Sequence, residues 1–185
     1  PETSVIPDYD KQKYHELILK KDTSIIFFST SQRENPNDND NKFNRQNKCN
    51  VQAIKELLEK LNILYSNNLA KPIPFTIGII AGYRGQVDLL KSSINLSQYS
   101  NFVQLETNEN GKQKKTNLIE INTVDKFQGA ERDIIIYDIV RSSKGQSNIG
   151  FLDDYRRINV AFSRVKRLLV VVGDSEYMIK RATLN

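Results

Sequence analysis

The segment YRRINVAFSRVKR, residues 155–167, holds two arginines at a spacing suited to binding an anion. On an α-helix Arg157 and Arg164 lie two turns apart on one face, with the small Ala161 between them. A guanidinium is always charged, and its fork of donors matches the oxygens of a phosphate. The spacing therefore predicts that the pair binds phosphate, and the alternative is a solvated basic face. The apolar stripe that should face the core comprises Ile158, Phe162 and Val165.

The segment INTVDKFQGAERDIII, residues 121–136, places polar side chains between two apolar runs. Asp125, Gln128 and Glu131 lie around Gly129, which punctuates the turn. A short loop held between two buried strands is well placed to touch a ligand, and Glu131 could accept a hydrogen bond from a sugar hydroxyl. Alternatively, the carboxylates only satisfy backbone donors of a capped turn. The residues alone leave both interpretations open.

A third segment, AGYRGQ, joins an apolar run to a helical pattern. An exposed ring at Tyr83 could stack on a base, and Arg84 at the start of a helix could reach a phosphate. A glycine-rich turn that carries a packed tyrosine fits these residues equally well.

The elements that position these segments follow from the hydrophobic pattern. Continuous apolar runs indicate strands buried on both faces of a parallel sheet, and the residues between them have helical spacing. The predicted strands are Ile25–Ser29, Thr76–Ala81, Glu120–Thr123, Ile134–Ile139 and Leu168–Gly173. The predicted helices are Val51–Leu64, Arg84–Ile94 and Asp154–Arg167. This alternation predicts a three-layer α/β fold with a mainly parallel central sheet. Ligands in such folds gather at the carboxyl ends of strands, which directs attention to the loops after Ala81, Thr123 and Ile139.

The three segments resemble, in order and spacing, motifs IV, V and VI of the Upf1-like branch of superfamily 1B helicases. The resemblance covers roughly Ile25 to Asp174 and implies a RecA-like motor domain, the second of two. Some positions depart from the family pattern: Gly82 stands where motif IV has proline, Ser163 where motif VI has threonine, and Gln52 where an early helix has glutamate.

The resemblance also implies roles at an ATP site. Tyr83 would stack on the adenine, Arg84 would reach the γ-phosphate and Glu131 would hold the ribose. Arg164 would be the arginine finger, which stabilises charge on the transferring phosphoryl group, and Arg157 would support it.

Four further positions take roles from the resemblance. Gln128 and Gly129 would lie near the nucleotide, whereas Thr123 and Val124 would face the nucleic-acid backbone.

The sequence has neither a GxxxxGK[ST] phosphate loop nor a DExx segment that ends a strand. The resemblance assigns both features to the first RecA-like domain of the same polypeptide, which would hold Mg²⁺ with ATP between the two domains. No metal ligands are therefore expected in this chain, and the chain alone is predicted to be inactive. The expected partners are that first domain and single-stranded RNA or DNA. The alternative function is a catalytically inactive RecA-like module that docks nucleic acid or protein. Retention of Arg164, Glu131, Tyr83 and Arg84 argues against it.

Composition sets wider limits. The formal net charge is +5, with a pI near 9.2, which agrees with a polyanionic partner. No apolar run approaches the length of a membrane span, and the single Cys49 fits a reducing compartment. We therefore expect an intracellular protein, cytoplasmic or nuclear.

The domain organisation is expected to be simple. Residues 1–22 form a polar lead-in and residues 23–185 form the domain. Within the domain, the Asn-rich stretch 32–50 is predicted to be an unstructured surface loop, because it contains too few apolar residues to form a core. The lysines at 112, 114 and 115 are interpreted as a solvated loop.

Overall fold

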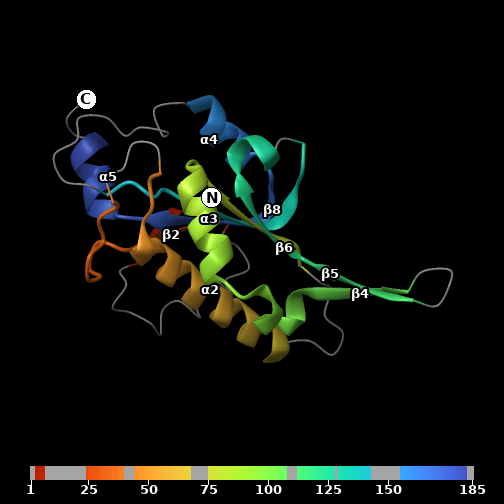
Figure 1. Ribbon diagram of the computed structural model, residues 1–185. Coiled ribbons are helices and arrows are strands. Elements are labelled where there is room, and N and C mark those ends of the chain that lie inside the picture. The colour runs from red at the N-terminus through yellow and green to blue at the C-terminus, as the bar shows by residue number, and fades with distance from the viewer. Residues whose placement is uncertain are drawn as a thin grey trace.

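The central element of the domain is a six-stranded, all-parallel sheet in the order β1-β2-β8-β7-β3-β6. The computed structural model describes residues 3–6, 24–39, 44–67, 75–107, 112–127, 129–142 and 155–182 (Figure 1). The strands are β1 (Thr3–Ile6), β2 (Ile25–Ser29), β3 (Ile77–Ala81), β6 (Ile119–Thr123), β7 (Arg132–Asp138) and β8 (Val165–Gly173). This architecture is the RecA-like α/β fold that the sequence predicts.

Helices cover both faces of the sheet. On one face α2 (Lys48–Asn67) and α3 (Arg84–Ser93) bury apolar side chains in the larger core cluster, as Figure 1 shows for their position across the strands. On the other face the short helix η3 (Val124–Phe127) and α4 (Tyr155–Phe162) contribute to a second cluster. The helix α5 (Ser175–Ala182) follows β8 and packs Met178 against that second cluster.

The apolar runs form strands because they are covered on both faces. Every residue of β3 is buried, as expected for a central strand of a parallel sheet. The predicted bounds of β2 are confirmed, and β3, β6, β7 and β8 contain most of the runs predicted for them.

The prediction for residues 154–167 was wrong at its C-terminal end. The helix α4 ends at Phe162, and Val165 already belongs to β8. The β-branched run that follows pairs with β7, and this pairing outweighs the helical spacing of three apolar residues. The faces of the helix also differ from the prediction: Ala161 is fully buried in the core, whereas Phe162 is 36% exposed and packs in a T-shaped arrangement with the Tyr137 ring.

The Asn-rich stretch was also predicted wrongly as unstructured, as judged from its described residues 32–39 and 44–50. The helix α2 begins inside it at Lys48. Asn47 and Asn50 are almost completely buried, as are Arg45 and Asp38. Polar side chains can be buried when they satisfy the donors and acceptors of neighbouring segments, and these residues do so.

Two further parts of the fold contain helices or strands that were not predicted from the sequence. After α3 the chain forms the short helices η1 (Leu96–Gln98) and η2 (Ser100–Phe102). An antiparallel hairpin of β4 (Val103–Thr107) and β5 (Gln113–Asn117) then extends away from the sheet (Figure 1). Lys114 and Lys115 therefore lie on a strand and not in a loop, and both are exposed.

The predicted lead-in contributes its described residues Thr3–Ile6 to the edge of the sheet as β1, and the rest of that segment lies outside the described residues. Among the described helices, none has the length and apolar content required to span a bilayer.

Candidate functional site

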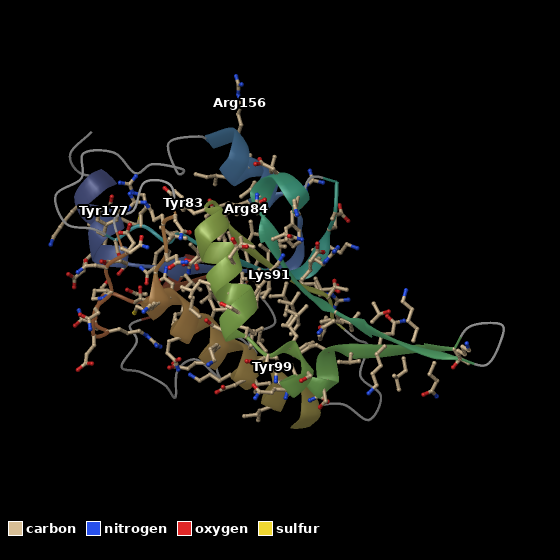
Figure 2. All side chains as sticks on the ribbon, viewed as in Figure 1. Tyr83, Arg84, Lys91, Tyr99, Arg156 and Tyr177 are labelled. Carbon is tan, nitrogen blue, oxygen red and sulfur yellow. The ribbon has the colours of Figure 1, made fainter. Side chains whose placement is uncertain are left out.

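The predicted site residues lie at two opposite ends of the sheet. At the carboxyl end, Ala81 of β3 is in register with Thr123 on one side and with Asp138 on the other. The turn with Tyr83 and Arg84, which are labelled in Figure 2, comes directly after β3. Because Ala81 is in register with Thr123, this turn lies at the same end of the sheet as Thr123. This is the end that parallel α/β folds use for ligands.

The amino ends of β7 and β8 bring together the other predicted residues. The backbone N–H of Arg132 donates to the carbonyl oxygen of Arg164 over 2.9 Å, and Arg132 is in register with Val165. Glu131 directly precedes β7, so it lies at this end, and Gly129 lies in the turn between η3 and β7. The six-residue offset along β7 between Arg132 and Asp138 corresponds to about 20 Å of strand. Arg164 and the Tyr83 turn are therefore separate parts of the domain surface.

Arg164 is half-buried in the turn between α4 and β8. Its Nε is buried and has no hydrogen-bond partner among the described residues, a state that the Nε atoms of Arg33 and Arg141 share. Native structures rarely leave a buried donor unsatisfied, so such a group needs an explanation.

Glu131 is exposed beside Arg164. Its Oε2 lies 3.6 Å from Nζ of Lys166, and both side chains are more than half exposed, so this ion pair contributes little stability. Its carbonyl oxygen accepts a 2.7 Å hydrogen bond from Nη1 of Arg132. Gly129 has φ +86°, a left-handed conformation that favours glycine. The loop is thus held by its backbone, while the carboxylate stays accessible.

Two predicted residues cannot be placed in this site. Gln128 lies outside the described residues, and Arg157 is described only as part of the α4 backbone. Within the described ranges, no group of three or more His, Cys, Asp or Glu side chains gathers that could hold a metal ion.

At the carboxyl end, the ring of Tyr83 is half-buried against the larger core cluster. The guanidinium of Arg45 lies 5.7 Å from the ring centroid, within the range of a cation–π contact. Arg45 is also paired with Asp38, and both side chains are buried. Burial lowers the pKa of Arg45, and the nearby Arg141 lowers it further. Nothing in the sequence marks Arg45 as buried, because an arginine within an Asn-rich stretch resembles a surface residue.

A buried carboxylate organises this end of the sheet. Asp138 accepts hydrogen bonds from Asn50 Nδ2 at 2.7 Å, from Gln86 Nε2 at 2.6 Å and from the backbone N–H of Val140 at 2.9 Å. Burial raises its pKa to about 6, and the three donors oppose that rise. Both of its oxygens thus act as acceptors of hydrogen bonds. No motif in the sequence marks it.

Gln86 connects this carboxylate to the start of α2. Its Oε1 accepts from the backbone N–H of Asn47 at 2.7 Å, and its Nε2 donates to the carbonyl oxygen of Asn47 at 3.1 Å. The side chain of Asn47 in turn donates to the carbonyl oxygen of Val140 at 2.9 Å. Val140 has φ 63°, a strained value for a β-branched residue, and these bonds hold it there. The network thus fixes the positions of α2, α3 and the end of β7 relative to one another.

Replacing Gly85 with alanine should loosen this arrangement. A Cβ at this position would lie 1.9 Å from Oδ1 of Asn44 and 3.1 Å from its backbone carbonyl carbon. We expect a loss of about 1–3 kcal/mol in the free energy of unfolding, as for other overpacked sites. Urea denaturation measures this loss. The double variant Gly85→Ala/Asn44→Ala should recover part of it, because the nearest contact is with a side chain. A single variant as stable as the parent would contradict the described approach of the two segments.

Comparison with known proteins identifies similar chains. Residues 4–176 match the model of a family described as AAA domain. The chain is 37% identical over 134 residues to the DNA polymerase alpha-associated DNA helicase A of Saccharomyces cerevisiae, which covers 72% of this chain and 16% of that protein. It is 36% identical over 142 residues to the Regulator of nonsense transcripts 1 homolog of Drosophila melanogaster; the match covers 77% of this chain and 10% of that protein. It is 32% identical over 133 residues to Helicase SEN1 of Saccharomyces cerevisiae; the match covers 71% of this chain and 5% of that protein. The chain therefore spans a small part of each of these relatives.

Proposed function

Because this chain belongs to the AAA domain family and is a Upf1-like superfamily 1 helicase domain, we propose that it is the second of two RecA-like domains of an ATP-dependent helicase motor. In this proposal ATP is held between this domain and a first domain of the same polypeptide. The domain supplies an arginine finger and part of the track for single-stranded RNA or DNA.

The observation that carries the proposal is the state of Arg164. Arg164 is half-buried at the amino end of β8, and its Nε has no acceptor among the described residues. Phosphoryl transfer is accelerated mainly by positioning and by electrostatic stabilisation of the transferring group. A γ-phosphate held by the first domain would supply the missing acceptor. Arg164 would then stabilise the charge that develops during hydrolysis.

Glu131 and Gly129 support the same end of the site. The exposed carboxylate of Glu131 is available to accept from a ribose hydroxyl, at the expense of its weak pairing with Lys166. The left-handed Gly129 lets the preceding loop turn without a side chain that would obstruct a ligand. The roles of Gln128 beside the nucleotide and of Arg157 beside Arg164 stay predictions.

The roles of Tyr83 and Arg84 also stay predictions. Stacking of Tyr83 on adenine and contact of Arg84 with the γ-phosphate would require the nucleotide to reach the carboxyl end of β3. That end lies about 20 Å along the strands from the level of Arg164. Arg45 also lies over the Tyr83 ring, so a base would stack on the opposite face or displace this guanidinium.

The nucleic-acid track is proposed at the end of β6. Thr123 is half-buried there, and the side chain of Val124 is buried in the core. Val124 would therefore contact single-stranded nucleic acid through its own backbone N–H and carbonyl groups. Such contacts do not distinguish one base from another. Contacts of this kind suit a motor that moves along any sequence of single-stranded nucleic acid.

The cofactor of the proposed motor is ATP with Mg²⁺. The described residues offer no carboxylate cluster for the metal, and the proposal assigns the metal ligands and the phosphate loop to the first domain. Mg²⁺ would neutralise charge on the phosphates, and Arg164 would act from the opposite side of the cleft.

The chain by itself should not hydrolyse ATP. An arginine finger accelerates the reaction only when it meets a nucleotide that is already bound with its metal, and here those binding parts are assigned to another domain. Phosphate release by the purified chain, measured with and without single-stranded RNA, should equal that of a buffer blank. Adding the first domain to the same polypeptide should give ATP hydrolysis that RNA or DNA stimulates. Hydrolysis by the isolated chain would refute this division of labour, and no hydrolysis by the two-domain protein would favour the inactive docking module.

A further inference from the structure

A chain of polar side chains runs along the edge strand β6 between the two ends of the sheet. Nζ of Lys91 on α3 donates to Asn122 Oδ1 over 3.3 Å, and Asn122 Nδ2 donates to Glu120 Oε1 over 2.7 Å. Oε2 of Glu120 is paired with Nη2 of Arg132, the first residue of β7. These four side chains, from Lys91, Asn122, Glu120 and Arg132, are called the β6 ladder below.

The strand itself keeps the middle of the ladder aligned. Successive side chains of a strand point to opposite faces, so Glu120 and Asn122 lie on one face and the buried Ile119 and Ile121 lie on the other. Both polar side chains are half-buried, which limits their freedom to leave one another for water. Because β6 is the outermost strand, Lys91 can reach Asn122 around the edge of the sheet.

The two ends of the ladder lie at the two parts of the proposed site. Asn122 precedes Thr123, the residue proposed to meet the nucleic-acid strand. Arg132 donates through Nη1 to the carbonyl oxygen of Glu131 and through its backbone N–H to that of Arg164. Its guanidinium also lies 5.6 Å from the centroid of the Phe127 ring, which is buried beneath it. One end of the ladder therefore lies beside the track, and the other end holds the residues proposed to act on the nucleotide.

We propose that the β6 ladder couples binding of a single strand at the Thr123 end to the position of Glu131 and Arg164. The inference rests on the function proposed above and deepens it by naming the positioning residues. A backbone phosphate attracts the exposed Lys91 ammonium more strongly than the amide oxygen of Asn122 does, because the phosphate carries a full negative charge and the amide oxygen is neutral. Once Lys91 leaves, the Asn122 amide is free to turn, its hold on Glu120 changes, and Arg132 moves with its partners.

The expected change in the stimulation of ATP hydrolysis follows from how exposed the contacts of the β6 ladder are. Coupling between two sites typically changes an equilibrium by about 5–150-fold. Lys91 is exposed and single exposed polar contacts are weak, so the lower end of that range applies. We therefore expect the ladder to account for about fivefold of the stimulation of ATP hydrolysis by nucleic acid.

The first test breaks the middle of the ladder in the two-domain polypeptide. Asn122→Leu should lower the ratio of ATPase rates with and without saturating single-stranded oligonucleotide by about fivefold, because Lys91 and Glu120 are then no longer connected in either state. The matched control is Gln104→Leu, which removes an exposed amide on the β4 hairpin strand and should keep the parental ratio. Urea denaturation verifies that each variant is folded.

The second test does not depend on the tolerance of residue 122. Lys91→Met and Glu120→Gln should each lower the stimulation, and the double variant should lower it no further, because both changes interrupt one ladder. If the losses of stimulation in the two single variants multiply in the double variant, the proposal is overturned. It is also overturned if Asn122→Leu keeps the parental ratio of ATPase rates with and without oligonucleotide. A two-domain parent that hydrolyses ATP without stimulation by nucleic acid would overturn both the ladder and the proposed function. A stimulated parent with unaffected variants would overturn the ladder alone.

Discussion

Replacing Arg164 with alanine in the two-domain polypeptide is expected to lower kcat for ATP hydrolysis by roughly 10³–10⁵-fold, the usual contribution of an arginine finger. The guanidinium would act on charge that appears on the transferring phosphoryl group, so its loss should affect the transition state far more than bound ATP. KM for ATP should therefore change little. Steady-state phosphate release at saturating ATP, in the presence of single-stranded oligonucleotide, measures both constants.

Arg156→Ala supplies the matched control for this experiment. Arg156 lies on α4, near Arg164 in sequence, but its side chain is exposed and points away from the body of the domain (Figure 2). Removing it deletes the same charge and should leave kcat within about twofold of the parent, which corresponds to less than 1 kcal/mol in the barrier. Equal rates for Arg164→Ala and Arg156→Ala would show that Arg164 has no special part in hydrolysis.

Replacing Asp138 with asparagine is expected to destabilise the chain although the change preserves shape. Asp138 Oδ2 accepts from Gln86, whose amide cannot turn because both of its polar atoms are bonded to the backbone of Asn47. Asp138 Oδ1 accepts from the backbone N–H of Val140, which has no other orientation. In either orientation the new amide nitrogen of asparagine would therefore face a fixed donor.

The cost of that conflict can be measured by thermal unfolding. A buried donor left without an acceptor costs about 1–3 kcal/mol. For a chain of this size such a loss lowers Tm by roughly 2–12 °C. Asp88→Asn makes the same chemical change on the exposed side of α3 and should leave Tm within about 1 °C of the parent, as surface substitutions usually do. If the Tm of Asp138→Asn equals the Tm of Asp88→Asn, the hydrogen-bond network around Asp138 does not stabilise the carboxyl end of the sheet.

The apolar runs allowed the sheet to be predicted closely. Residues such as Ile79 and Val170 are buried in strands with neighbours on both sides, and continuous runs of that kind have few other stable conformations. The turns with Tyr83 and with Glu131 were located for the same reason, since each follows or precedes such a run. Their residue types also carried the resemblance to superfamily 1 helicases, which the family comparison confirms.

Other features depended on contacts between segments distant in the sequence. The spacing of Arg157 and Arg164 suggested one helical face, but pairing of β8 with β7 ends the helix before Arg164. The buried Ala161 then fills the core and cannot form part of an open anion site. Helical spacing describes a single element, whereas the end of that element is decided by strand pairing with a partner.

Local hydrophobic pattern thus determined which segments of this protein become buried strands and which turns carry reactive side chains. Only the tertiary structure decided how the polar residues are used: that Asn47 and Asp138 lie in the interior, that Arg45 lies over Tyr83, and that Arg164 and Tyr83 occupy opposite ends of the sheet. The physical reason is that apolar burial depends on composition and period along the chain. A buried polar group, in contrast, is stable only when particular donors and acceptors from distant segments meet it.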